Sequence, residues 1–309
     1  MKKIIPCVFI TLSLIFAGSF LPVLGFIGII LCPLPLAILG CIEGQKTASI
    51  AELLIEATLF FAVSPSMAVY FLIGCAPLSG MIYLLSRDEF KTAKKYSGAE
   101  TLLVCAGVSI LAKVILLVVL WLFTGRNMLF PDPSQLAAIM SQMYGEDPEL
   151  MTIARQVLGI FPYMLPAMLV IYCGIESFMN YSLCSTLTKK LFPSSKNYPP
   201  ELPEFKLWKF PVSLLAASAL SLIAGYFIDI DTWFEGSMFV MNLQIVINIF
   251  MFIEGVALAF WLMAGFKLRR GTKIFISVLF AIPFFWPWLI VIGMCDMVLN
   301  MRERIKFGA

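Results

Sequence analysis

The apolar stretch at residues 157–188, VLGIFPYMLPAMLVIYCGIESFMNYSLCSTLT, decides the fold because it is long enough to cross a bilayer. It ends at Lys189 and Lys190, yet it holds Glu176 and Asn180 near its middle. A carboxylate in hydrocarbon is costly. We therefore expect Glu176 to face protein or a water-filled cavity and to have a partner of opposite charge or hydrogen-bonding capacity.

Composition identifies the class of protein. Hydrophobic residues make up 61% of the 309 residues and charged residues 13%, and the mean hydropathy is +0.94. Soluble domains average about 25% charged residues, so this chain is too apolar to fold around one soluble core. The sequence predicts an all-α, polytopic transmembrane helix bundle that lies in a lipid bilayer.

The chain has no histidine, so it lacks the usual general base, proton shuttle and metal ligand near neutral pH. Its eight cysteines are scattered through apolar stretches without a C-x-x-C pair, which is typical of packing residues. No glycine-rich phosphate loop or nucleophile motif is visible. We therefore expect no enzyme, no metal site and no cofactor, and no nucleic acid among the partners.

Apolar runs separated by polar loops divide the chain. We expect about eight spans, followed by a hydrophobic segment at residues 274–300 that Pro283 and Pro287 break. We expect the whole chain, residues 1–309, to form one integral membrane domain. Its expected parts are two N-terminal hairpins at 1–98, a central helix pair at 99–190 with an external amphipathic helix at 133–144, a cytoplasmic Pro-rich loop at 191–210 and C-terminal helices at 211–309.

Lys and Arg set the expected orientation. Nearly all of the 22 basic residues fall in clusters that alternate with loops almost free of them, and cytoplasmic loops carry such clusters. We expect a multi-pass protein of the bacterial cytoplasmic membrane with its N-terminus inside, residues 126–154 outside and residues 189–210 inside. Two half-spans at 274–300 would keep the basic tail inside, whereas a single crossing would place it outside.

Three ionisable residues lie at one depth in the predicted bundle. At 1.5 Å per residue, Lys113, Glu176 and Glu254 are each about 20 Å from the nearest cytoplasmic charges. We expect Lys113 to pair with Glu176 or Glu254, because a buried Lys needs a partner. The polar residues expected to accompany this layer are Asn180, Gln244 and Asn248.

Two interpretations of this polar layer remain open. Intramembrane ionisable groups are functional by default, which favours a site for a small solute or ion. Alternatively, the layer only fastens helices together, since polar contacts between membrane helices contribute about 0.6 kcal/mol each on average.

A second pair of carboxyl groups, Glu52 and Glu56, lies four residues apart on one face of a predicted helix. These residues are close enough to Lys46 to line a vestibule open to the cytoplasm. A helix end that dips into the lipid headgroups would explain them equally well.

The loop at residues 199–211, PPELPEFKLWKFP, is rich in aromatic residues for a cytoplasmic surface. Clustered exposed aromatics usually mark a contact. Phe205 and Trp208 could lie among lipid headgroups with the nearby Lys side chains on anionic lipid. Alternatively, the prolines up to Pro211 could hold the loop against the cytoplasmic mouth of the bundle, where it meets a partner subunit.

The stretch Leu202–Pro211, LPEFKLWKFP, together with Asn180–Tyr181 and the segment from Gly293 through Asp296 to Arg302, resembles the YybS-like bacterial membrane proteins. The resemblance implies a multi-pass bacterial protein and no established activity. More distantly, the layout of the first six spans looks like the substrate-binding subunits of energy-coupling-factor vitamin transporters.

These observations favour a membrane-embedded component that binds or transports a small molecule or ion. It would depend on partner membrane or ATPase subunits, because no nucleotide-binding motif is visible in this chain. The alternative is a membrane scaffold or regulatory protein that docks a partner through its cytoplasmic loop.

Overall fold

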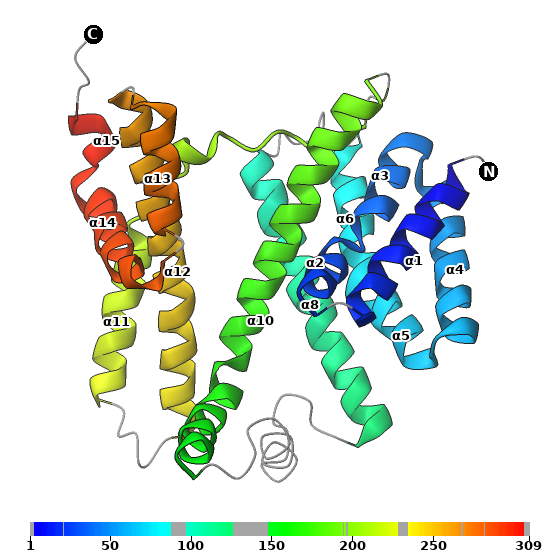
Figure 1. The fold of residues 1–309 in the computed structure, drawn as a ribbon, viewed down its shortest axis with the longest axis horizontal. Helices are drawn as coiled ribbons and strands as arrows, with labels where there is room; N and C mark the ends of the chain where they lie inside the picture. The colour runs from blue at the N-terminus through cyan, green and yellow to red at the C-terminus, as the bar shows by residue number, and fades with distance from the viewer. Residues whose placement is uncertain are drawn as a thin grey trace. The chain divides into compact units, whose positions relative to one another are not determined.

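The computed structural model describes residues 3–20, 22–87, 97–125, 148–193, 195, 197–227, 234–266, 268–280 and 282–305 (Figure 1). All regular secondary structure in these residues is helical, as the composition predicts. The chain forms two compact units. Unit 1 comprises Met1–Pro162 and Leu169–Leu202, and unit 2 comprises Tyr163–Met168 and Pro203–Ala309. The expected single membrane domain stays a prediction.

Unit 1 is built from short helices at its N-terminal end and two long ones. Its helices are α1 (Ile4–Phe20), α2 (Pro22–Leu31), α3 (Leu34–Glu43), α4 (Gln45–Ala62), α5 (Pro65–Val69), the π-helical turn η1 (Tyr70–Cys75), α6 (Ala76–Ser86), α8 (Gly98–Thr124) and most of α10 (Pro148–Leu191).

Local signals in the sequence explain where these helices begin and end. Pro33 has no backbone N–H to continue the ladder, and α2 ends before it. Gly44 adopts a φ of 89° between α3 and α4, a conformation that a side chain disfavours. The hydroxyl of Ser64 accepts a hydrogen bond from the Met67 amide at 3.2 Å and caps α5. Ser97 and Glu100 form a capping box at the start of α8.

The core of unit 1 lies between the N-terminal helices and the two long ones. One cluster of buried side chains joins α1, α3, α4 and η1, with Ile55, Leu59 and Phe71 at its centre. A second cluster joins α3, α6, α8 and α10 around Tyr181. The second cluster packs α8 and α10 against α3 and α6, which positions the two long helices for the site described below.

Unit 2 contains the remaining described helices. They are η2 (Phe205–Leu207), α11 (Ser213–Phe227), α12 (Phe234–Gly265), α13 (Arg270–Phe280), η3 (Pro283–Phe285), α14 (Trp286–Leu299) and α15 (Met301–Arg304).

The closest packing in unit 2 joins α12 and α14 (Figure 1). A Cβ added to Gly255 would lie 1.9 Å from the carbonyl oxygen of Leu289, and one added to Gly293 would lie 2.0 Å from that of Met251. The two backbones therefore approach through glycines, as small residues allow in membrane helices.

Among the described residues, five helical segments are long and apolar enough to cross a membrane, or six if a bent pair counts as one more. They are Phe26–Glu43, Pro65–Ser86, Gly98–Phe123, Tyr163–Leu191 and Met238–Gly265. The expected count of about eight spans is not confirmed. The short apolar helix at Ile4–Ala17 falls below the length needed, as does α11 with its 15 residues, and α4 carries three charged residues.

The C-terminal apolar run divides at its prolines, as expected. Arg270–Phe280 and Pro283–Leu299 meet at an angle of 86°, which fits a broken span or a re-entrant loop. Return of the chain to its starting side stays a prediction. The amphipathic helix expected at residues 133–144 lies outside the described residues.

We predict that Gly255→Ala and Gly293→Ala each destabilise unit 2 by about 1–3 kcal/mol or more, because the added methyl group overlaps a backbone carbonyl. Thermal unfolding of the protein in detergent measures this effect. Gly107→Ala in α8 is the matched control, since nothing lies within 4 Å of its Cβ position. Equal melting temperatures for Gly255→Ala and the control would contradict the close crossing.

Candidate functional site

A buried ion pair joins the two long helices of unit 1. Lys113 Nζ on α8 lies 3.0 Å and 3.1 Å from the two carboxylate oxygens of Glu176 on α10. The Lys113 side chain is 6% exposed and that of Glu176 is fully buried. The sequence predicted a pairing of Lys113 with Glu176 or Glu254, and Glu176 is the partner.

Further contacts compensate these two charges. Ser109, one turn before Lys113, donates a hydrogen bond of 2.5 Å to the second oxygen of Glu176. Lys113 also donates to the carbonyl oxygen of Gly74. The rings of Tyr70 and Tyr172 lie 6.0 Å and 5.8 Å from the ammonium group, within reach of a cation–π interaction. The charges are therefore enclosed by groups that can stabilise them.

The network is attached to two irregular helices. Gly74 belongs to the π-helical turn η1, and π turns inside α-helices are frequent at functional sites. Asn180, one turn after Glu176, donates a 2.7 Å hydrogen bond to the carbonyl oxygen of Ile30. Ile30 lies at the end of α2, just before the break at Pro33. Polar side chains of α8 and α10 thus bind backbone carbonyls where the helical ladder is interrupted.

Two polar atoms of α10 residues that are close to Glu176 in the sequence have no hydrogen-bond partner among the described residues. They are the side-chain carbonyl oxygen of Asn180 and the hydroxyl of Ser177, and both residues are fully buried. Buried polar groups are normally satisfied by protein, water or a ligand. One buried acceptor and one buried hydroxyl of α10 are therefore left without a partner in the described part of the chain.

Sequence reasoning did not select Ser109, Ser177 or the carbonyl of Gly74. Ser109 lies four residues before Lys113 and so on the same face of the helix, which is a signal that the sequence contains, whereas the position of Ser177 directly after Glu176 gives no such signal. A backbone carbonyl released by an irregular turn has no such signal.

The other members of the expected polar layer belong to unit 2. Glu254 on α12 accepts hydrogen bonds from Arg302 at 3.0 Å and from the backbone N–H of Phe210 at 2.7 Å. Gln244 donates to Asn248 at 3.0 Å. Glu254 therefore has its own cation, and the expectation that it shares a layer with Lys113 stays a prediction.

The aromatic loop has its backbone fixed to unit 2. Arg302 donates to the carbonyl oxygens of Lys206 at 3.1 Å and Trp208 at 2.6 Å. The Trp208 indole donates to the carbonyl oxygen of Pro203 at 3.0 Å, and the Phe205 ring lies 5.3 Å from that of Trp208. Pro211 is exposed.

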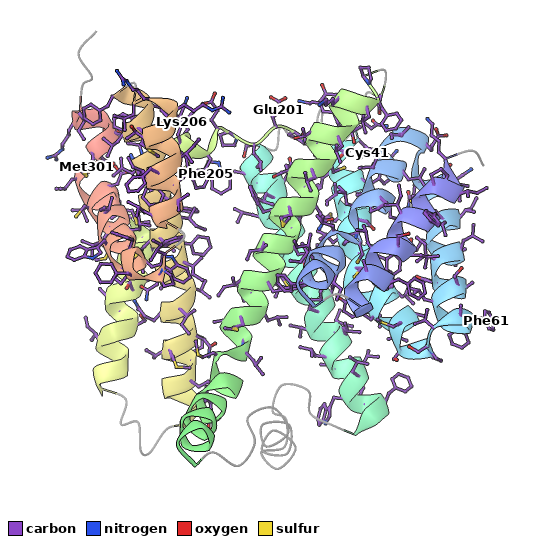
Figure 2. The ribbon with its side chains drawn as sticks, viewed as in Figure 1. Cys41, Phe61, Glu201, Phe205, Lys206 and Met301 are labelled. Atoms are coloured by element: carbon purple, nitrogen blue, oxygen red, sulfur yellow. The ribbon has the colours of Figure 1, made fainter. Side chains whose placement is uncertain are left out.

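Apolar side chains of this loop are exposed, and Figure 2 labels Phe205 among them. Phe205 is 37% exposed and Leu207 is 54% exposed. The loop therefore presents apolar side chains from a backbone that buried polar groups hold in place.

Among the described residues, only one of the two carboxyl groups expected to line a vestibule, that of Glu52, lines a pocket. Glu52 lines a small pocket of about 100 Å³ together with Gln45, Ser49, Ser79 and Tyr83. Glu56 is not among its lining residues, and one of the Glu56 carboxylate oxygens is buried without a partner in the described part of the chain. A role for the two carboxyl groups in access stays a prediction.

A larger hollow of about 450 Å³ lies near the C-terminal end of α10. Its lining residues are Tyr181, Ser182, Ser185, Thr186, Lys189, Lys190, Glu201 and Leu202. The Lys189 ammonium donates to Glu201 and holds the pKa of that exposed carboxyl below its usual value. Sequence reasoning did not identify this hollow, since it depends on how residues 197–202 pass α10.

Comparison with known proteins supports the resemblance found in the sequence. The family model described as "Predicted membrane protein (DUF2232)" matches residues 9–297. The chain is 22% identical over 179 residues to "Uncharacterized protein YybS" of Bacillus subtilis strain 168. This match covers 57% of the chain and 55% of YybS, so the chain spans about half the length of that relative. No solved structure matches the chain.

We predict that Lys113→Met and Glu176→Gln each destabilise the protein by about 3–5 kcal/mol, because each leaves a buried polar or charged partner without compensation. The double variant should lose less than the sum of the two. Unfolding of all three variants in detergent gives the coupling between the side chains. The half-exposed pair of Lys3 and Glu43, at 2.6 Å, is the matched control, with single substitutions that change stability by about 0–1 kcal/mol. Additive losses at Lys113 and Glu176 would contradict direct coupling.

Proposed function

We propose that this chain, which belongs to the family of predicted membrane proteins described as DUF2232, binds or transports a small polar solute or ion within the membrane. The observation that carries this proposal is a buried ion pair between Lys113 and Glu176 whose Lys113 is bound to the π-helical turn η1, while Asn180, one turn from Glu176, is bound to the helix that ends before Pro33. Irregular backbone at membrane depth is tolerated where protein or a cavity covers it. Discontinuous helices are also where many transporters bind substrates and coupling ions.

The chemistry of the site indicates the kind of ligand. Lys113 and Glu176 neutralise each other, so the site carries no excess charge. The unpartnered carbonyl oxygen of Asn180 accepts hydrogen bonds, and the Ser177 hydroxyl both donates and accepts them. We therefore propose a small neutral or zwitterionic solute with at least one N–H or O–H group.

The location of the protein, its orientation in the membrane and its partners are also part of what we propose. We propose a bacterial cytoplasmic membrane location with a cytoplasmic N-terminus, on the basis of the Lys and Arg clusters. Transport against a gradient would need partner membrane or ATPase subunits. The likeness to substrate-binding subunits of energy-coupling-factor transporters stays a prediction from the layout of the spans, as does the absence of catalytic activity.

The test is native mass spectrometry of the gently solubilised protein, which detects a co-purified small molecule and partner subunits together. Ser177→Ala is the sharpest variant, because its hydroxyl makes no hydrogen bond to a described residue. We expect the variant to keep its fold and to hold the solute up to about tenfold more weakly, as the loss of one hydrogen bond predicts.

The matched control for this experiment is Ser86→Ala. Ser86 is equally buried, but its hydroxyl already donates to the carbonyl oxygen of Ile82. Absence of a bound molecule from the wild-type protein, or equal solute retention in the Ser177→Ala and Ser86→Ala variants, would argue against a binding site beside the ion pair.

A second candidate function is that of a membrane scaffold or regulator. The supporting observation is the loop around η2, whose backbone is fixed by Arg302 and Glu254 while Phe205 and Leu207 are exposed. A fixed loop loses little conformational entropy on binding a partner, which favours recognition.

We predict for this function that Phe205→Ala combined with Leu207→Ala lowers the affinity for a co-purifying partner at least about tenfold, as expected for interface hot spots. A pull-down from cells that express the tagged variant measures the loss. Phe61→Ala in α4, which removes an 85% exposed ring from unit 1, is the control (Figure 2). Unchanged capture by the double variant would assign the loop to the lipid headgroups.

A further inference from the structure

Unit 2 contains a buried cluster with more negative than positive charge. Glu254 on α12 and Asp296 on α14 are both fully buried. A single guanidinium, that of Arg302, lies 3.0 Å from a Glu254 oxygen and 2.9 Å from an Asp296 oxygen. Two ionised carboxylates and one cation would leave one uncompensated negative charge in the interior, which is strongly unfavourable.

Neighbouring cations do not remove this imbalance. Lys206 pairs with Glu204 at 2.5 Å, and Lys209 pairs with Glu303 at 3.5 Å. The helix α11, which packs on α12, carries no charged residue. The other cations in the described part of unit 2 form no ion pair with either carboxyl group. They are Arg304 on α15 and Arg269, Arg270 and Lys273 around α13.

The hydrogen bonds of the two carboxyl groups differ. Both oxygens of Glu254 accept a hydrogen bond, one from Arg302 and one from the Phe210 amide. Neither oxygen of Asp296 accepts one from the described residues. Both carboxyl groups nevertheless share the Arg302 guanidinium, which lies 3.0 Å from an oxygen of Glu254 and 2.9 Å from an oxygen of Asp296. An ionised carboxylate can only accept hydrogen bonds, whereas a protonated carboxyl group can also donate one.

We propose that Glu254 and Asp296 hold one proton between them, and that this proton keeps residues 203–210 bound to unit 2. The proton restores neutrality to the cluster, as in other pairs of carboxyl groups that share one proton. It also gives the Asp296 carboxyl group, whose oxygens have no hydrogen-bond partner among the described residues, a donor of its own. Its release to solvent leaves two adjacent carboxylates that repel each other.

The loop responds because its backbone is bound by the same groups. Arg302 donates to the carbonyl oxygens of Lys206 and Trp208, and Glu254 accepts from the Phe210 amide. Loss of the proton would draw water to the excess charge and weaken both attachments. This proton site is separate from the solute site proposed in unit 1 and does not depend on it.

The test is hydrogen exchange of the Phe210 amide in the intact protein, reconstituted in a bilayer and measured by mass spectrometry. Asp296→Asn is the variant, because its amide donates a hydrogen bond as protonated Asp296 does and cannot lose a proton at these pH values. We divide the wild-type exchange rate by the Asp296→Asn exchange rate at each pH, because this ratio cancels the pH dependence of amide exchange itself. We expect a constant ratio at low pH and a rise of about tenfold per pH unit once the site loses its proton.

Glu303→Gln is the matched control, since it removes a neighbouring surface carboxyl that pairs with Lys209. It should keep the wild-type profile. The proposal is overturned by a constant ratio between about pH 5 and 9, by a ratio that follows sodium concentration at fixed pH, or by a Glu303→Gln profile that is flat like that of Asp296→Asn.

Infrared spectroscopy of the wild-type protein gives a second test that needs no stable Asp296 variant. We expect the C=O stretch of a protonated carboxyl group at neutral pH, which disappears on raising the pH and is missing from Glu254→Gln. The absence of such a band from the wild-type spectrum would overturn the proposal.

Discussion

The ion pair between Lys113 and Glu176 constrains unit 1 more than any other contact, because neither charge can be exposed to lipid or left alone. Hydrogen bonds with the Ser109 hydroxyl and the Gly74 carbonyl offset the cost of burying the two charges. The helices α8 and α10 and the π-helical turn must therefore all be in place together. Hydrophobic packing of the N-terminal helices brings these groups together, and the ion pair makes their positions specific. An irregular helix is thereby held against a polar centre inside a largely apolar bundle.

The sequence could predict this pair because depth along a helix follows from residue number at a fixed rise per residue. The same reasoning could not identify the partner of Glu254, since depth does not say which helices are neighbours. Arg302 lies in a short helix after α14 and reads as part of a solvated tail. The span count is not confirmed, because α4 carries three charged residues and α11 is described over 15 residues only.

Most of the residues that carry the resemblance to YybS-like proteins gather in one place in unit 2, whereas Asn180 and Tyr181 belong to unit 1. The loop LPEFKLWKFP, the close approach at Gly293, the Asp296 carboxyl and Arg302 all belong to the environment of Glu254. Each residue alone is an ordinary sequence feature. Together they form a single buried polar cluster that fixes an aromatic loop, which gives a physical reason for their occurring in one chain.

The contact between Arg302 and the Trp208 carbonyl joins residues 94 positions apart and has a consequence for biosynthesis. Ribosomes add about 5–20 residues per second, so roughly 5–20 s pass between synthesis of the loop and synthesis of its anchor. During that interval α11 to α14 are synthesised while the aromatic segment lacks its attachment to Arg302. The Glu254 carboxyl group and the Phe210 amide can therefore meet before the arginine that completes the cluster exists.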